Sequence, residues 1–385
     1  MGVTILAELA ALSETIKKAA TVSPGSKDPN YTKIGGIVIE IDPISTYAVV
    51  MSTDHDVWYR EESQAIESVT GYDPDSIGFL RYRFSTPLLA GYFSTLKPKA
   101  GDKLKIEIDG MVAKFSVRTS VMTTRLLLCN EYPTWADDSK FIDSWIQVDN
   151  LGRLINEVGY AADDADTHLG VRIASTYVAA TNRGRFAMHN WPDNGIPDNG
   201  FTIPTRALVG VLHNMGEVNL ALLDKMLILQ PDEFTSIRVR LIEVVFPDIR
   251  SLVNSQFPGK SAEVTFSKNE LSDIITRVMK VDKDEFNIVE LILGDEEVAA
   301  YRVEDGDINS VGDLFETPGQ CVHERVWFYV NGAYLIEALS HAPHDEVTLT
   351  YDEFNGSKGL KLREIRIISG DYTAMIAQRV KPKGK

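Results

Sequence analysis

The sequence contains little cysteine, which excludes two kinds of stabilising framework. Its 385 residues include two cysteines, Cys129 and Cys321, which lie far apart and outside any Cys-x-x-Cys pattern. A disulfide framework or a cysteine zinc site needs more thiols at closer spacing. We therefore expect a reducing compartment and a cytoplasmic protein.

Long apolar runs are also missing. No stretch approaches the roughly 18 consecutive apolar residues that a membrane-spanning helix needs. The amphipathic segment 1–18 carries Glu8 and Glu14, and it lacks the basic start and the unbroken apolar core of a signal peptide. We expect neither a membrane span nor a secretory leader.

Catalytic motifs are the third absence. The sequence has no Gly-x-Ser-x-Gly, His-Glu-x-x-His or Gly-x-Gly-x-x-Gly pattern. Gly259-Lys260-Ser261 looks like the end of a phosphate-binding loop, but Asn254 stands where that motif requires its first glycine. A linker accounts for this segment better, and no nucleotide site is predicted.

Three clusters of possible metal ligands also fail on geometry. On a predicted strand, His55 points away from Asp54 and Asp56, because successive side chains alternate faces. His341 and His344 flank a proline that breaks helical spacing, and the acidic run 163–166 lacks the glycine and glutamate of a calcium loop. We predict no metal, no cofactor and no enzyme activity, and a hydrolase or metal enzyme is the most distant alternative.

What the sequence does contain is an internal repeat at intervals of roughly 120 residues. Four apolar residues spaced three and four apart recur 120 residues later, and a looser copy opens the chain. This spacing places one apolar stripe on a helix. The three copies are Leu9, Leu12 and Ile16; Leu151, Leu154, Ile155 and Val158; and Leu271, Ile274, Ile275 and Val278.

A second helix is predicted in each copy, over 86–96, 205–215 and 331–341. Each follows a short apolar strand and precedes strands with alternating polarity, such as 103–109. Alternation indicates antiparallel sheets with one buried face. The predicted fold class is therefore α+β, with two helices and two antiparallel sheets in each of three repeated domains.

Turn-forming residues mark the boundaries between these copies. They gather at 132–139 and 254–260, so we expect domains over 1–138, 139–257 and 258–385. Each is long enough to bury its own core. Edge strands at the ends of such units can pair with a neighbour, so a continuous sheet across units or across chains is expected.

The net charge is −16, from 39 basic and 55 acidic residues, and it argues against nucleic acid as a partner. Net charge, however, does not describe the field on one surface. The predicted helices carry cations that could line one face, although on charge alone an ordinary solvated face is the simpler interpretation. These cations are Lys17, Lys18, Arg153, Arg206, Arg277 and Lys280.

Several segments resemble one family, the bacterial replicative sliding clamp, which is the beta subunit of DNA polymerase III. Segment 180–187 resembles its Ala-Thr-Asp-Gly-His-Arg-Leu-Ala run, and 240–250 resembles its Arg-Leu-Ile-Glu-Gly-x-Phe-Pro-Asp-Tyr-Arg run. Segments 201–204 and 370–380 resemble its entry to the middle-domain helix and its terminal strand. Ser52-Thr53-Asp54 is a weaker first-domain counterpart of the Thr-Asp element.

The resemblance implies a non-catalytic processivity factor. Two chains would join head to tail as a homodimer, so that three domains per chain become six around a closed ring. The helices would line the hole, and duplex DNA would be contacted non-specifically through its phosphates. The implied partners are DNA, the replicative polymerase and the clamp loader, and the six cations named above become candidates for the DNA-facing lining.

The family also carries a peptide-binding pocket between its second and third domains. The resemblance places this pocket at three segments of the present chain, with His168 or Leu169 as a further wall. The implied pocket residues are Leu169, Thr181, Arg183, Gly184, Arg185, Phe186, Pro247, Ser251, Leu252, Ala374, Ile376, Ala377 and Gln378.

Three departures from the family pattern bear on which partner is bound. Gly184 replaces a usual histidine, Ser251 replaces a frequent arginine, and Ala377-Gln378 replaces a Pro-Met or Pro-Val pair. We expect a pocket adapted to other peptides in a divergent replisome, of a phage or of a cell. The alternative function is a clamp-like interaction scaffold that binds protein tails without encircling DNA.

Overall fold

The structure of the chain is a computed structural model. It describes residues 2–73, 78–135, 142, 144–162, 170–192, 194–205, 210–212, 215–254, 261–281, 287–294, 297–302, 312–316, 326–355, 361–377 and 379. The chain forms two compact units, Met1–Gly152 with Arg206–Leu241, and Arg153–Thr205 with Ile242–Lys385. The middle third of the sequence therefore contributes to both units.

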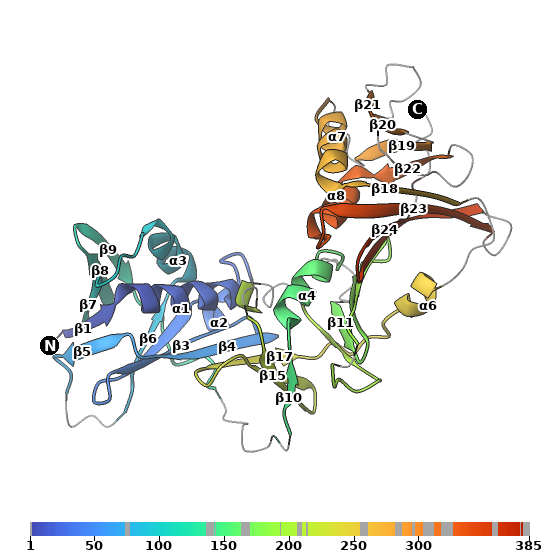
Figure 1. Ribbon diagram of the computed structural model, residues 1–385. Coiled ribbons are helices and arrows are strands. Elements are labelled where there is room, and N and C mark those ends of the chain that lie inside the picture. The colour runs from blue at the N-terminus through green and yellow to red at the C-terminus, as the bar shows by residue number, and fades with distance from the viewer. Residues whose placement is uncertain are drawn as a thin grey trace. The chain divides into compact units, whose positions relative to one another are not determined.

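The first unit contains a five-stranded sheet near the N-terminus (Figure 1). All of its neighbouring strands pair antiparallel. Their order is β5 (Ile66–Thr70), β1 (Val3–Glu8), β7 (Lys103–Asp109), β8 (Val112–Val117) and β9 (Ser120–Arg125).

A second sheet of the first unit has eight strands, four from the first third of the chain and four from the middle third. The two halves join where β17 pairs antiparallel with β4, with Val239 opposite Val57. The order is β10 (Ile146–Val148), β15 (Val218–Leu223), β16 (Met226–Gln230), β17 (Thr235–Arg240), β4 (Val57–Ser63), β3 (Tyr47–Thr53), β2 (Ile37–Asp42) and β6 (Leu80–Phe84).

The second unit repeats this plan with strands of the middle and last thirds. Its eight-stranded sheet joins where β13 pairs with β25, and the order is β14 (Phe201–Ile203), β11 (Val171–Ala174), β12 (Tyr177–Thr181), β13 (Arg185–Asn190), β25 (Tyr372–Ala377), β24 (Lys361–Ser369), β23 (Glu346–Asn355) and β18 (Ser261–Ser267). Its four-stranded sheet is β21 (Gly312–Glu316), β20 (Glu297–Arg302), β19 (Ile288–Gly294) and β22 (Val326–Asn331). The expected pairing of strands across repeats is confirmed at both junctions.

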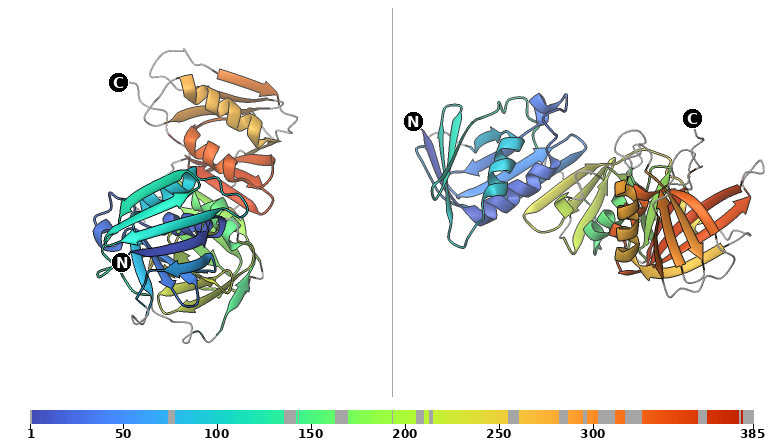
Figure 2. Two further views of the ribbon diagram at one scale, coloured as in Figure 1. Left: turned by 90° about the vertical axis from the view of Figure 1, so that its left-hand side faces the viewer. Right: turned by 90° about the horizontal axis from the view of Figure 1, so that it is seen from above.

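Helices pack in pairs beside these sheets. In the first unit α1 (Leu9–Val22) contacts α3 (Thr86–Thr95), and in the second α7 (Lys268–Val281) contacts α8 (Gly332–His341) (Figures 1 and 2). The predicted helices over 86–96 and 331–341 are confirmed. Of the predicted helix over 205–215, residues 205, 210–212 and 215 are described, and 210–212 are helical. The other helices are α2 (Tyr31–Ile34), α4 (Leu151–Gly159) and α6 (Ile249–Asn254).

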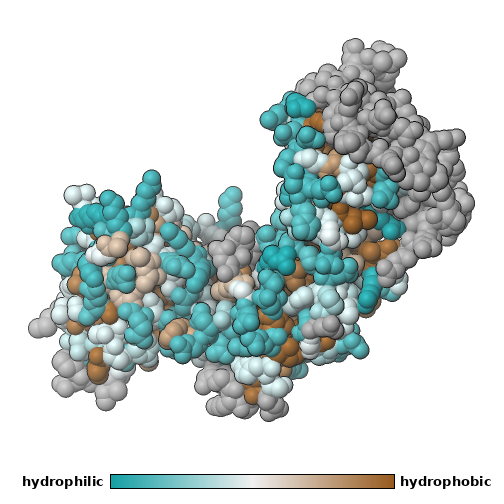
Figure 3. Space-filling view, in the orientation of Figure 1, coloured by the Kyte–Doolittle hydropathy of each residue, from teal (hydrophilic) through white to brown (hydrophobic). Residues whose placement is uncertain are grey.

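The apolar stripes predicted from residue spacing face the core. Every stripe residue of α1, α4 and α7 named above is buried, and none is more than 2% exposed. Burying one such side chain stabilises the fold by about 1.5–3 kcal/mol. Hydrophilic residues predominate on the face of the first unit in Figure 3 where α1 and α3 lie. No helix among the described residues is long and apolar enough to span a bilayer.

One local prediction is wrong, because Asp54-His55-Asp56 forms a turn between β3 and β4 rather than part of a strand. The Asp54 carboxylate accepts hydrogen bonds from the backbone N–H groups of Asp56 (3.0 Å) and Val57 (2.7 Å). His55 has a φ of 82°. A short acidic side chain that bonds to the following backbone favours such a turn over continued strand pairing.

Arg83 of β6 is the largest fully buried side chain of the first unit, at 2% exposure. Its guanidinium donates to the carbonyl oxygens of Gly35 (2.7 Å), Leu128 (2.8 Å), Thr32 (3.1 Å) and Tyr31 (3.2 Å). It thus joins the α2 segment and the end of the first third to one strand. Arg83 therefore supplies hydrogen-bond donors to backbone carbonyl groups outside the strands, which have no partner strand to pair with.

Arg83→Met should destabilise the first unit by about 3 kcal/mol, because it leaves the buried Gly35 carbonyl and three partly buried carbonyls without this donor. Denaturant unfolding, followed by tryptophan fluorescence, measures the loss. Arg81→Met is the matched control, since Arg81 makes a partly exposed pair with Glu40 at 3.1 Å and should cost less than about 1 kcal/mol. Equal losses for the two variants would contradict this account of Arg83.

Candidate functional site

A cavity of about 260 Å³ lies in the second unit, beside the junction of β13 and β25. Three segments form it: the turn between β12 and β13, the chain leading into α6, and the end of β25. Its lining residues are Thr181, Arg183, Gly184, Arg185, Phe186, Pro247, Ile249, Leu252, Met375, Ile376 and Ala377.

The β12–β13 turn is held by its own side chains. The Thr181 hydroxyl donates to the carbonyl of Arg185 (2.7 Å) and accepts from the Arg183 N–H (3.1 Å). The Asn182 amide oxygen accepts from the N–H groups of Gly184 and Arg185, both at 3.0 Å. Arg183 takes a φ of 71° at the tip and is exposed. The short polar residues therefore fix a tight turn that carries an arginine at the cavity rim.

The floor of the cavity is apolar. Phe186 lies opposite Met375 in the β13–β25 register, and both pack with Ile249 of α6 in one buried cluster. Leu252 stands at the edge with 43% of its surface exposed. An apolar floor beside a partly exposed leucine can receive the apolar side chains of an extended peptide.

The polar wall of the cavity is Arg185, whose side chain is 9% exposed. Its guanidinium donates to the Tyr160 carbonyl (2.7 Å), pairs with Glu337 of α8 and lies 4.1 Å from the centre of the Tyr334 ring. These contacts hold Arg185 in place from α8 and from the segment after α4. Arg185 therefore shapes the cavity, whereas the exposed Arg183 offers its charge to a ligand.

Nine of the residues predicted for the peptide pocket lie together in this lining, and two do not. Ala374 is fully buried inside the sheet, opposite Ala187. Ser251 is exposed and its hydroxyl donates to Asp248 (2.5 Å). This hydrogen bond also holds the pKa of Asp248 below its usual value. Leu169, His168 and Gln378 lie outside the described residues.

Ile249 and Met375 also line the cavity, although neither is among the predicted pocket residues. Ile249 lies within the segment that resembles the clamp family. Met375 lines the cavity because β25 pairs with β13 and brings it opposite Phe186. Only an assumed register between strands that are far apart in sequence could have indicated it.

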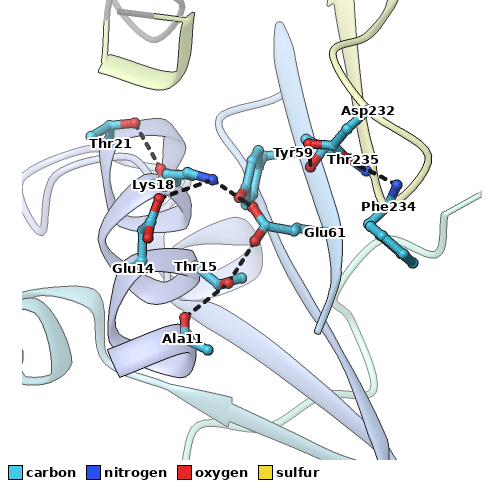
Figure 4. A network of polar contacts seen from close by, with 10 residues as sticks. All are labelled: Ala11, Glu14, Thr15, Lys18, Thr21, Tyr59, Glu61, Asp232, Phe234 and Thr235. Atoms are coloured by element: carbon cyan, nitrogen blue, oxygen red, sulfur yellow. Dashed lines mark hydrogen bonds and ion pairs between the residues drawn. The ribbon is translucent and has the colours of Figure 1, made fainter. Parts of the chain in front are cut away.

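The cations predicted to face DNA have different surroundings. Lys17 on α1 is exposed, but the neighbouring Lys18 reaches Glu61 of β4 at 3.2 Å and Glu14 at 3.6 Å (Figure 4). Glu61 also accepts hydrogen bonds from Thr15 (2.6 Å) and from the hydroxyl of Tyr59. The charge of Lys18 is therefore largely compensated within its own unit.

The predicted cations of the second unit lie on α4 and α7. Arg153 of α4 pairs with Glu157 at 2.7 Å, and Nδ1 of His189 lies 2.7 Å from the other oxygen of that carboxylate. Arg277 and Lys280 of α7 are exposed. Arg206 lies outside the described residues. Among the described residues, no three His, Cys, Asp or Glu side chains gather as metal ligands.

Comparison with solved structures shows what this fold resembles. The beta subunit of DNA polymerase III from Thermotoga maritima aligns with a TM-score of 0.77 and 15% identity, covering 98% of this chain and 99% of that chain. The subunit from Borrelia burgdorferi, solved in complex with a natural product, gives 0.77 and 15% over 98% of both chains. That from Pseudomonas aeruginosa gives 0.72 and 14%, over 98% of this chain and 100% of that chain.

No protein-family model matches the sequence, and no curated protein matches it. The chain nevertheless has the α+β fold of bacterial DNA polymerase III beta subunits over nearly its whole length, so the resemblance stated from sequence segments is confirmed for the fold. The low identity marks it as divergent. The three structures come from bacteria and give no support to a phage source.

The Glu157 cluster makes the stability of the second unit depend on pH. Burial by itself would raise the pKa of Glu157, but the interaction with His189 and the charge of Arg153 together hold it below the usual 4.5. A carboxylate with a lowered pKa stabilises the fold above its unfolded-state value, and this contribution is lost as the pH falls through the folded-state value.

Glu157→Gln should therefore destabilise the protein most at neutral pH, and the difference from the wild type should shrink below about pH 4.5. Unfolding midpoints measured in denaturant between pH 7 and pH 3.5 test this expectation. Glu263→Gln, at an exposed position of the same unit, is the control and should track the wild type. A deficit that is independent of pH would contradict the role given to ionised Glu157.

Proposed function

We propose that this protein is a DNA sliding clamp, a non-catalytic processivity factor that tethers the replicative polymerase. The observation that carries the proposal is the likeness of fold to DNA polymerase III beta subunits over 98% of the chain. We further propose three clamp domains, 1–138, 139–257 and 258–385, as the repeat in the sequence suggests. The clamp loader is the second protein partner on this reading.

The proposed ring is a homodimer in which the first domain of one chain meets the third domain of the other. Such a head-to-tail interface is heterologous, and it must close on itself to avoid a filament. Two edge strands in the described part of the chain are available for it, β9 in the first unit and β21 in the second. Val121 on β9 is 55% exposed, as an interface residue in a free chain would be.

Duplex DNA is the proposed occupant of the ring. Lys17, Arg277 and Lys280 are exposed cations on α1 and α7. Lys18 and Arg153 form ion pairs with carboxylates of their own units. A small number of phosphate contacts gives weak binding that depends steeply on salt. Weak contacts favour sliding, and retention on DNA would then come from topology.

Partner proteins are proposed to dock in the cavity beside β13 and β25. Its apolar floor fits leucine or phenylalanine anchors of an extended peptide, and Arg183 at the rim fits an acidic or polar neighbour. Gly184 leaves the turn without a side chain, where a Cβ would meet Asn182 at 3.5 Å and Tyr334 at 3.8 Å. This opening supports a peptide preference different from that of clamps with a histidine here.

The protein, once assembled on a nicked circular plasmid, should remain bound at high salt and be lost when the circle is cut. Gel filtration of the plasmid before and after linearisation measures retention. The triple variant Lys17→Glu, Arg277→Glu, Lys280→Glu should weaken low-salt binding to linear DNA several-fold, because phosphate contacts are lost. Lys33→Glu, at an exposed position of α2, is the charge-matched control.

Equal retention on circular and linear DNA would overturn topological linkage. Molar mass in solution separates the second candidate, a scaffold that binds protein tails without encircling DNA. A clamp should have about twice the 42.8 kDa of one chain at micromolar concentration. A monomer under those conditions would favour the scaffold.

Phe186→Ala should weaken binding of the polymerase's tail peptide by at least about tenfold, because truncating a buried aromatic anchor removes 2 kcal/mol or more. Isothermal titration with peptides from the polymerase and the loader of the same organism measures the change. Ser251→Ala is the control, because Ser251 lies outside the lining, and this variant should bind the peptide normally. Unchanged affinity in Phe186→Ala would remove this cavity as the docking site.

A further inference from the structure

The hairpin turn that borders the candidate peptide cavity occurs a second time, in the first unit. Thr53 and Asp54 at the end of β3 repeat the bonds of Thr181 and Asn182. The Thr53 hydroxyl donates to the Val57 carbonyl (2.9 Å) and accepts from the His55 N–H (3.0 Å). His55 and Arg183 take φ values of 82° and 71° at the two tips.

The strand beyond each turn is also matched. At the first junction the Arg240 N–H donates to the Asp56 carbonyl (2.7 Å), and at the second the Ala377 N–H donates to the Gly184 carbonyl (3.0 Å). The register places Arg238 opposite Trp58 in the one case and Met375 opposite Phe186 in the other. The two junctions therefore share one backbone arrangement.

Different side chains occupy this shared backbone. Trp58 stands where Phe186 does, Arg238 where Met375 does, and Arg240 where Ala377 does. The result is a groove of about 590 Å³, larger than the cavity of the second unit. Its lining residues are His55, Trp58, Thr134, Met226, Arg238 and Arg240.

The aromatic part of this groove is fixed in place. The Trp58 indole N–H donates to the His55 carbonyl (3.3 Å), and the Trp58 ring meets that of Trp135 edge to face, with centroids 6.5 Å apart. The Arg238 guanidinium lies 4.1 Å from the centre of the Trp135 ring. Trp58 in the groove lining is thus held by its hydrogen bond and by Trp135, and Arg238 of the same lining stacks on Trp135.

The outer part of the groove is cationic. Arg238 and Arg240 are two residues apart on β17, so both side chains project from the same face of the sheet. The Arg240 side chain is 67% exposed, and the carboxylate of Asp56, itself 57% exposed, lies 3.9 Å away. An exposed pair at this distance contributes little, so a well-placed carboxylate can replace it.

We propose that this groove is a second peptide-binding site, which takes an extended acidic segment of a partner protein. An apolar side chain of the segment packs on Trp58 and Met226, and a carboxylate reaches Arg240. The peptide class rests on the function proposed for the second-unit cavity, whereas the acidic preference rests on the groove's own residues. The chain then carries two docking sites of one backbone design, one apolar and one cationic.

Single-stranded nucleic acid is the other ligand that arginine and tryptophan can bind. The peptide is favoured because the groove lies beside a strand junction and a turn with the same pattern of backbone hydrogen bonds as those of the apolar cavity. The experiment must therefore separate the two ligands.

Fluorescence anisotropy of the full chain tests the proposal with a fluorescein-labelled probe, Gly-Leu-Glu-Phe-Glu-Gly. The probe should bind at least tenfold more tightly than its matched partner Gly-Leu-Lys-Phe-Lys-Gly. Arg240→Glu, at an exposed position, should fold normally by circular dichroism and weaken binding at least tenfold. Trp58→Ala should weaken it similarly, and Lys33→Glu should change it less than twofold.

Each alternative has its own outcome. Equal binding of the acidic and basic probes, or no binding of the acidic probe, would overturn the proposal. Loss of binding in Phe186→Ala, with Arg240→Glu unaffected, would place the probe in the second-unit cavity and also overturn it. Displacement by oligothymidylate at lower concentration than by unlabelled probe would assign the groove to nucleic acid. Failure of the clamp to close on DNA would leave these comparisons unchanged.

Discussion

The structure depends on the pairing of edge strands between repeats. A strand at the edge of a sheet leaves a row of backbone N–H and C=O groups without partners, and a four-stranded sheet has two such rows. Here β17 of the middle third pairs with β4 of the first, and β13 of the middle third pairs with β25 of the last. Two eight-stranded sheets result, and the middle third is shared between both compact units.

This pairing also explains where the cavity of the second unit and the groove of the first unit lie. At each junction a hairpin turn, β3–β4 or β12–β13, stands beside a strand that ends there, and the backbone bonds across the junction are alike. The repeat in the sequence placed Arg183, Phe186 and Pro247 at one junction only. The same hairpin turn occurs at both junctions, because it needs only a threonine followed by Asp or Asn. The side chains that line the groove and the cavity beside these turns differ in size and charge.

Much of the architecture could be predicted from residue spacing. The stripe that begins at Leu151 and its copy from Leu271 are buried as expected, because helical periodicity is a local property of consecutive residues. The turn at His55 was missed because Asp54 competes locally for the backbone, and an alternating pattern does not reveal that competition. Met375 was missed because its place in the lining depends on a register with a strand from the middle third.

The sequence by itself determined the α+β class, the threefold repeat, the main helices and most of the apolar cavity's lining. The class, the repeat and the helices follow from periodicity, whereas the lining follows from short continuous segments that resemble the clamp family. Tertiary structure alone decided which charges face solvent: Lys18 is compensated by Glu61, a residue 43 positions away, whereas Lys17 beside it is exposed. It also decided that the Arg238 guanidinium packs over the ring of Trp135. Such contacts join distant segments, and their energies depend on distance and burial that no local pattern encodes.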